Sequence, residues 1–98
     1  MYVAMAVFDL LLGDVRTLKQ KRGVVRPIVA EAQRKFPVTA AETGHQELYR
    51  RAEVGVASVA GEPAHCSAVL DSVERWMSER PEVELVAVRR RLASSDDE

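Results

Sequence analysis

Apolar residues along this chain form long runs that alternate with two segments of helical spacing. Residues 2–12 are almost continuously apolar, on both parities of an extended chain. A strand with one face in water would alternate polar with apolar residues, so this run predicts a central strand covered on both faces. Residues 51–60 show the same two-sided pattern, which predicts a second central strand. Residues 38–42 and 83–92 predict two further strands.

The first helical segment begins at Thr17 and ends before Pro37. Thr17 and Gln20 have the spacing of a capping box, in which the threonine accepts from a first-turn amide and the glutamine reaches back. Pro27 interrupts the segment, because it cannot donate to the carbonyl of Gly23 and its ring clashes there. We therefore expect a kink between Gly23 and Pro27. The alternative is a break, with a new helix beginning at Pro27.

The second helix is expected over residues 64–79, and Cys66 lies on its apolar stripe, which predicts a buried and unreactive thiol. The order is then strand, helix, strand, strand, helix, strand. This split βαβ arrangement gives an α+β ferredoxin-like sandwich, a four-stranded antiparallel sheet with two helices on one face. We expect one domain over residues 1–92 and a short acidic tail over residues 93–98.

The second face of such a sheet has no helix to cover it, although the strands carry apolar residues on both faces. A monomer would leave a sizeable apolar patch in water, so we expect a homodimer that packs through this open face. The alternative is that small residues such as Ala4, Gly55 and Ala57 tolerate exposure.

The amino-acid composition is that of a globular protein. The chain has 98 residues, of which 47% are hydrophobic and 30% charged, as in ordinary globular domains. The sequence has no run of about 18 apolar residues, so we expect no transmembrane helix. The apolar start lacks a basic flank and a small-residue cleavage site, so it is interpreted as a strand and not as a signal peptide. A single cysteine excludes an internal disulfide framework, and we expect a cytoplasmic protein.

The net charge of −1 hides an uneven distribution, because residues 16–35 carry +6 and the rest of the chain carries −7. Lys19, Arg22 and Arg26 share one stripe of the first helix, and Lys21 flanks the apolar face on its other side. Basic side chains beside a helix N-terminus suit phosphate groups. The predicted nucleic-acid or anion site is therefore Arg16, Lys19, Lys21, Arg22 and Arg26. The alternative interpretation is a solvated helix face with no ligand.

A second candidate site lies in the turn after residue 42, where Glu42, His45 and Glu47 are close in sequence and Gln46 lies between them. Such residues can form an acid–base pair or contribute to a metal site. A turn histidine bonded to the backbone is the simpler interpretation, and we predict no bound metal or cofactor. The chain has no phosphate-binding loop, nucleophile elbow, zinc-protease motif or dinucleotide fingerprint, so we do not expect an enzyme.

Four short motifs resemble those of the bacterial YlxP family. They are TLKQKRGVVR at residues 17–26, AETGHQELYRRA at 41–52, VER at 73–75 and PEVEL at 81–85. The resemblance spans about residues 1–92 and departs from the family pattern at Pro27, Gly44 and His45. It implies a ferredoxin-like fold but no chemistry. Because genes of this family often lie beside the gene for ribosome-binding factor A, it also implies a role in ribosome maturation or translation.

Two functional hypotheses follow. In the first, the basic first helix contacts ribosomal RNA or a ribosome-associated protein, which is the partner that the resemblance implies. We do not expect RNA bases to stack on aromatic residues of the central strands, because residues 52–60 contain no aromatic residue. In the second hypothesis, a dimeric regulatory module binds a small anion near residues 13–18 and the His45 loop.

Overall fold

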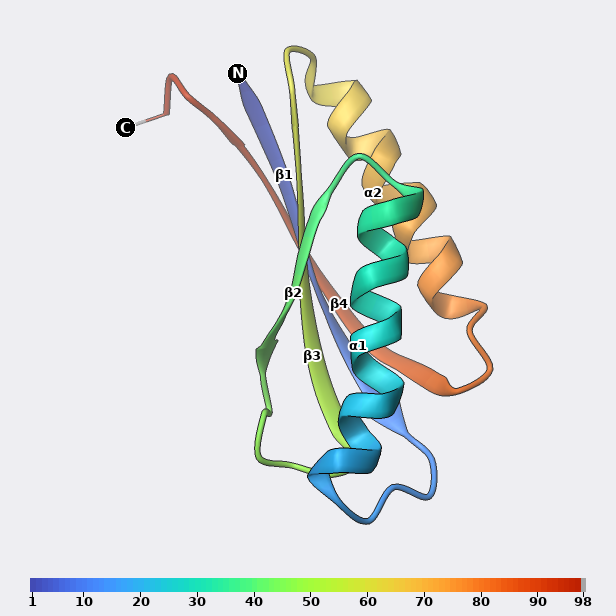
Figure 1. Cartoon of the computed structure of the whole chain (residues 1–98). Coiled ribbons are helices and arrows are strands. Elements are labelled where there is room, and N and C mark those ends of the chain that lie inside the picture. The colour runs from blue at the N-terminus through green and yellow to red at the C-terminus, as the bar shows by residue number, and fades with distance from the viewer. Residues whose placement is uncertain (98) are drawn as a thin grey trace.

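A computed structural model describes residues 1–97, and Figure 1 shows their arrangement. The strands form one antiparallel sheet in the order β2-β3-β1-β4, and both helices lie on the same face of it. The structure therefore confirms the predicted ferredoxin-like α+β fold. The elements are β1 (Tyr2–Leu12), α1 (Leu18–Lys35), β2 (Thr39–Gly44), β3 (Arg51–Ala60), α2 (Pro63–Ser78) and β4 (Val83–Ser94).

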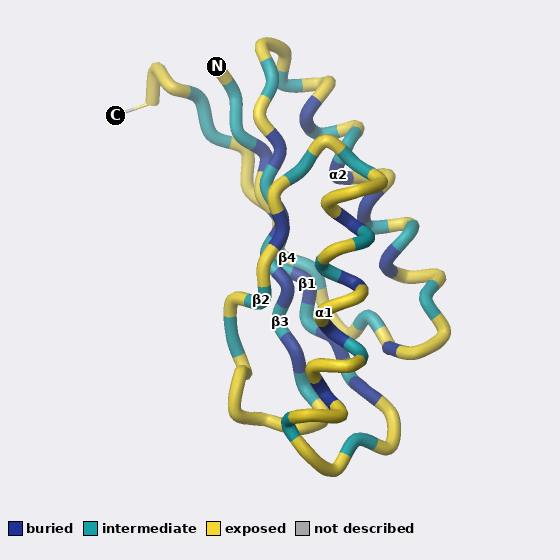
Figure 2. Tube along the Cα trace, in the orientation of Figure 1, coloured by how far each residue is buried: buried dark blue, intermediate teal, exposed yellow. Residues whose placement is uncertain are grey.

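The hydrophobic core lies between the helices and the sheet (Figure 2). Alternate residues of a strand point to opposite faces, so β1 turns its even-numbered residues from Ala4 to Leu12 toward the helices. In β3 the even-numbered residues do the same. The helices complete the core with Val25, Ile28 and Ala32 of α1 and with Cys66, Leu70, Val73 and Met77 of α2. The thiol of Cys66 is buried, as predicted.

Helix α1 begins where the capping residues predict. The Oγ1 atom of Thr17 accepts from the amide of Gln20 at 3.1 Å, and the Gln20 side chain accepts from the amide of Arg16 at 2.7 Å. The helix continues through Pro27 as one element, so the predicted alternative of a break is wrong. Gly23 and Pro27 both lie on the exposed side, where water can reach a carbonyl that has lost its donor.

Arg80 joins the two helices to the start of β4. Its guanidinium lies 3.0 Å from Glu31 and 2.8 Å from Glu82, and it covers the Trp76 ring at 4.7 Å. Trp76 in turn meets Phe36 edge to face, with 5.7 Å between the ring centroids. Burial raises the pKa of Glu82, but a backbone hydrogen bond and the Arg80 guanidinium lower it, and the lowering is larger.

Strand β4 differs from the prediction at its end. It continues to Ser94, two residues beyond the predicted boundary. Its final residues pair with the start of β1, and the amide of Ser95 donates to the carbonyl of Met1 at 2.8 Å. The predicted acidic tail is therefore partly strand, and Asp97 folds back to accept from the amide of Ser94 at 2.7 Å. Glu98, the last residue of the predicted tail, lies outside the described residues.

Candidate functional site

A row of cations follows the exposed side of α1. Lys19, Arg22 and Arg26 are spaced by three and four residues, which places them one above another on a helix. All three are exposed, and no carboxylate of residues 1–97 lies within ion-pair distance of them. The first turn of α1 contains no acidic residue, so nothing there offsets the positive end of the helix dipole. We call these three residues the basic row.

Two other residues of the predicted anion site lie elsewhere. Arg16 is exposed just before α1 and pairs with Asp14 at 3.3 Å, in a contact that is open to solvent on both sides. Lys21 is only 2% exposed, which corrects the prediction that it binds an external anion. Its ammonium pairs with Glu42 at 3.2 Å and donates to the carbonyl of His45. Lys21 is buried because β2 lies beside α1 and places the Glu42 carboxylate against the helix turn that contains Lys21.

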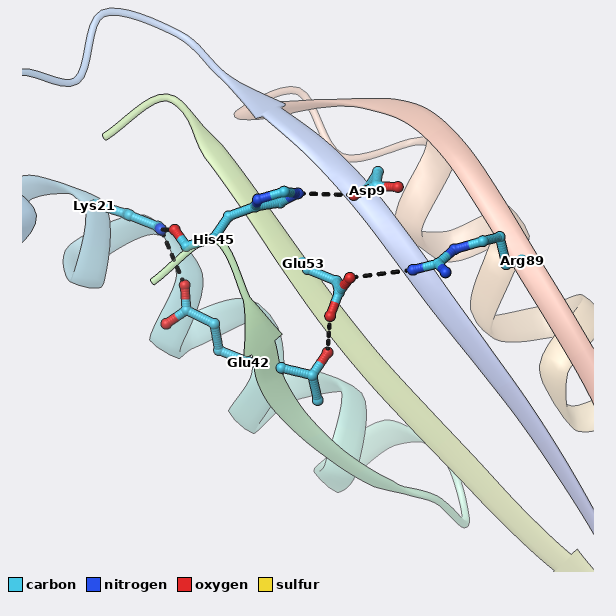
Figure 3. A network of polar contacts seen from close by, with 7 residues as sticks. Asp9, Lys21, Glu42, His45, Glu53 and Arg89 are labelled. Carbon is cyan, nitrogen blue, oxygen red and sulfur yellow. Dashed lines mark hydrogen bonds and ion pairs between the residues drawn. The ribbon is translucent and has the colours of Figure 1, made fainter. Parts of the chain in front are cut away.

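The residues of the predicted loop site separate to two sides of the sheet (Figure 3). The Glu42 side chain points toward Lys21 on α1, whereas the His45 ring crosses the open face and its Nε2 atom lies 3.4 Å from Asp9. The Gln46 amide donates to the carbonyl of Glu42 at 3.4 Å. Glu42 and His45 therefore do not form an acid–base pair. Within residues 1–97, no three histidine, cysteine, aspartate or glutamate side chains gather closely enough to hold a metal ion.

The open face carries an ionic network that the sequence interpretation missed. Glu53 of β3 accepts from the Thr43 hydroxyl at 2.7 Å and from the Arg89 guanidinium at 3.2 Å (Figure 3). Asp9 of β1 lies directly opposite Glu53 in the register and pairs with His45. These contacts connect all four strands across the open face. The sequence does contain a signal for this network. Strand alternation places the charged residues Asp9, Glu53 and Arg89 on the face that points away from the helices.

Two glycines make room for this network. A Cβ atom on Gly44 would lie 2.7 Å from the Glu53 carboxylate, and one on Gly55 would lie 2.8 Å from the Thr43 side chain. The pairing of β2 with β3 shifts register between Glu42 and Gly44, so Thr43 is an extra residue on its strand. The turn continues through His45, whose φ of 55° lies in the left-handed region. The bulge thus decides which loop side chains reach the open face.

The three consecutive arginines of β4 alternate between the two faces of the sheet. Arg90 points to the helix side, where it lies 2.6 Å from Asp71 and donates to the carbonyl of Ser67 at 3.0 Å. Arg89 and Arg91 pair in register with Val7 and Met5, so they belong to the open face. The arginines therefore do not form one cationic patch.

The centre of the open face is apolar but partly shielded. Met5 is 39% exposed and Val59 is 61% exposed, whereas Val3, Val7 and Ala57 are half-buried by their neighbours. Charged residues of both signs surround this centre, since Glu53, Asp9, Arg89 and Arg91 share the face. We call the set Val3, Met5, Val7, Ala57 and Val59 the open-face patch.

Comparison with known proteins supports the resemblance read from the motifs. Residues 3–90 match the family described as "Protein of unknown function (DUF503)". The chain is 29% identical over 87 residues to a Bacillus subtilis protein named "Uncharacterized protein YlxP", and the match covers 89% of this chain and 95% of that protein. Neither of the described helices is long and apolar enough to cross a membrane. The chain therefore belongs to the DUF503 family, whose function is unknown.

Proposed function

We propose that this protein is a cytoplasmic, non-enzymatic RNA-binding protein whose contact surface is the basic row of α1. The observation that supports the proposal is that these three cations have no ion-pair partner among residues 1–97. Arg80, Arg89 and Arg90 are each held by a carboxylate of the same chain. The residues of the basic row have no such partner among residues 1–97, so their charge is available to an external polyanion.

The spacing of the row suits a chain of phosphates. Side chains three or four residues apart on a helix have Cβ atoms about 5–6 Å apart, and long flexible cations from such positions can reach neighbouring phosphates. The free amides and positive dipole end of the first turn add to the attraction. Each neutralised phosphate releases counterions, so binding of this kind is strong in low salt and weak in high salt.

The neighbouring β2–β3 loop favours a single-stranded RNA. It exposes Leu48 and Tyr49 by about half of their surface. Arg50 of the same loop donates to the carbonyl of Gly13 at 2.9 Å, which ties the loop to the connection that leads into α1. An exposed tyrosine beside cations is a platform on which an unpaired base can stack. A double-stranded RNA would offer no base to this ring.

The expected partner is ribosomal RNA, because the family resemblance implies a role in ribosome maturation or translation. The test measures binding of labelled ribosomal RNA fragments and of small-subunit particles at about 50 and 200 mM salt. We expect Lys19→Glu with Arg22→Glu to weaken binding at least about tenfold and to reduce the salt dependence. Tyr49→Ala should weaken binding to single strands more than to duplexes.

The matched control is Arg34→Glu with Arg75→Glu, which makes the same change in net charge at two exposed positions away from the basic row. Circular dichroism of both double variants checks that the helices are intact. The proposal fails if wild-type protein binds no RNA fragment or particle in low salt, or if the control variant loses as much binding as the basic-row variant.

The proposal includes a homodimer that packs through the open-face patch. Val59 and Met5 would be covered by a second copy, and the acidic and basic residues around the patch offer the second copy charges of both signs. Light scattering should give twice the mass of one chain. Val59→Asp should give a monomer, whereas Leu92→Asp should not, since Leu92 is 47% exposed but pairs in register with Ala4 and so faces the helix side. A wild-type monomer at micromolar concentration would contradict the dimer.

A small anionic ligand near residues 13–18 has less support. The cavity beside Gly13 measures about 310 Å³ and is lined by Glu84, whose charge repels an anion, and by Glu82, which is paired with Arg80. Its one cation is Arg50, and the Nε atom of that residue already donates to the backbone.

A further inference from the structure

The sheet has two edge strands, β2 and β4, and they are protected to different degrees. An unpaired edge can accept another strand, and proteins discourage this with charged residues and bulges. Each edge strand has a register shift against its neighbour, so charge distinguishes them, and β4 carries Arg89, Arg90 and Arg91 in succession. β2 begins with Thr39, Ala40 and Ala41, which carry no charge. The β2 edge is therefore the more receptive of the two.

Two glutamine side chains occupy backbone groups of β2. The amide of Ala40 donates to the Oε1 atom of Gln33 on α1, and the carbonyl of Glu42 accepts from the Nε2 atom of Gln46. Both distances are 3.4 Å, which is long for a hydrogen bond of this type. A strand lying along β2 would offer the same donor and acceptor groups at better geometry. The glutamines thus act as replaceable partners of the edge.

A groove runs beside this edge, between α1 and β2. It encloses about 260 Å³ and is lined by Val25, Arg26, Val29, Ala30, Gln33 and Glu42. Its valine and alanine side chains suit an apolar side chain, and Arg26 adds positive charge. The carboxylate of Glu42 is neutralised by Lys21, so it does not oppose an acidic ligand.

We propose that an extended peptide, with apolar and acidic residues at successive positions of one face, adds to the free edge of β2. Its backbone displaces Gln33 and Gln46, an apolar side chain enters the groove, and the next side chain on that face, a carboxylate two residues away, pairs with Arg26. This is strand addition, in which backbone bonds supply affinity and pockets for alternate side chains supply specificity. The ligand is a segment of a partner protein, and the site shares Arg26 with the basic row but uses neither Lys19 nor Arg22.

Charge argues against the other occupants of this edge. A second copy that paired through β2 would bring two basic rows side by side, and like charges at an interface oppose association. An RNA strand has no backbone amide with which to replace Gln33 and Gln46, and its phosphates gain nothing from the valines of the groove. The apolar groove beside unpaired cations therefore fits an acidic peptide best.

The test uses a synthetic peptide of eight residues in which valine and glutamate alternate along one face, with threonine at the positions between them, together with the same sequence N-methylated at alternate amides. NMR titration of the full chain should shift the backbone amides of residues 39–42 and of the facing turns of α1. N-methylation should weaken binding at least about tenfold, because it removes the donors that a strand needs. Equal binding of the two peptides would show a purely electrostatic contact and would overturn the proposal, and so would the absence of binding.

Three variants sharpen the result. Gln33→Ala should strengthen peptide binding about threefold, because it removes the side chain that competes for the Ala40 amide. Arg26→Glu should weaken binding, and Arg34→Glu, on the same helix but away from the groove, should not. Gln33→Ala should also leave RNA binding unchanged, which separates this proposal from the RNA contact. If Gln33→Ala without peptide instead forms a larger oligomer than the wild-type protein, a second copy occupies the edge and the proposal is wrong.

Discussion

The two faces of the sheet are built from the same strands but follow different physical rules. The face under the helices buries Phe8, Leu10 and Leu12 of β1 almost completely, and Phe8 is 0% exposed. One residue away, Val7 is only half-buried on the open face and has Arg89 as its neighbour on β4. The covered face therefore supplies stability through packing, whereas the open face holds an ionic network around a patch suited to a partner. Substitutions at neighbouring positions of one strand can test this division.

The largest effect is expected from Phe8→Ala. Removing this fully buried ring leaves a cavity, which costs about 3–5 kcal/mol of the free energy of unfolding. The matched change on the open face is Val7→Ala, for which we expect a loss of about 1 kcal/mol or less. Urea unfolding of both variants, at protein concentrations too low for a dimer to form, measures the difference between their free energies of unfolding. Similar losses for the two variants would mean that the open face is packed as tightly as the covered one.

A smaller effect is expected from Lys21→Met, which keeps the apolar stem of the residue and removes its charge. The carboxylate of Glu42 then loses its cation in a largely buried position, which we expect to cost about 1–3 kcal/mol of the free energy of unfolding. Adding Glu42→Leu should recover part of this loss, because no unpaired charge remains. A double variant that is less stable than Lys21→Met alone would show that Glu42 stabilises the fold by some contact other than Lys21.

The smallest effect is expected from Arg89→Ala on the open face. Arg89 is 68% exposed, so its ion pair with Glu53 is screened by water and salt, and we expect a loss of about 0.2–1 kcal/mol. The loss should shrink further in high salt. Thermal unfolding at two salt concentrations measures it. A loss as large as that of Lys21→Met would place the Glu53 network among the main determinants of stability.

The sequence was sufficient for the fold because hydrophobic period and element order agree along the chain. The two-sided apolar runs of residues 2–12 and 51–60 identify the central strands, and helical spacing identifies α1 and α2. The family motifs imply the same fold independently. Pro27 was harder to interpret, since a proline can either end a helix or be tolerated within it. Pro27 is exposed, so water can reach the carbonyl of Gly23 that has lost its donor, and the helix continues through it.

The site could be predicted only in part because two of its features depend on contacts distant in sequence. A helical projection places Lys21 beside the apolar face, but it cannot show that Glu42 of β2 lies opposite and draws the ammonium inward. The direction of the His45 ring depends on the bulge at Thr43, which no hydrophobic pattern encodes. By contrast, the exposure of Lys19, Arg22 and Arg26 follows from helix period alone.

The pairing of Ser95 with Met1 has a practical consequence for experiments on this chain. Met1 and Ser95 meet at one corner of the molecule, at the end of the sheet opposite to the start of α1 (Figure 1). A tag or surface anchor at either position therefore leaves the basic row free. A short linker between them would also close the chain into a ring, and new ends could then be opened in the exposed loop at residues 46–49. Such a circular permutant would keep both faces of the sheet intact while changing the order in which the strands are synthesised.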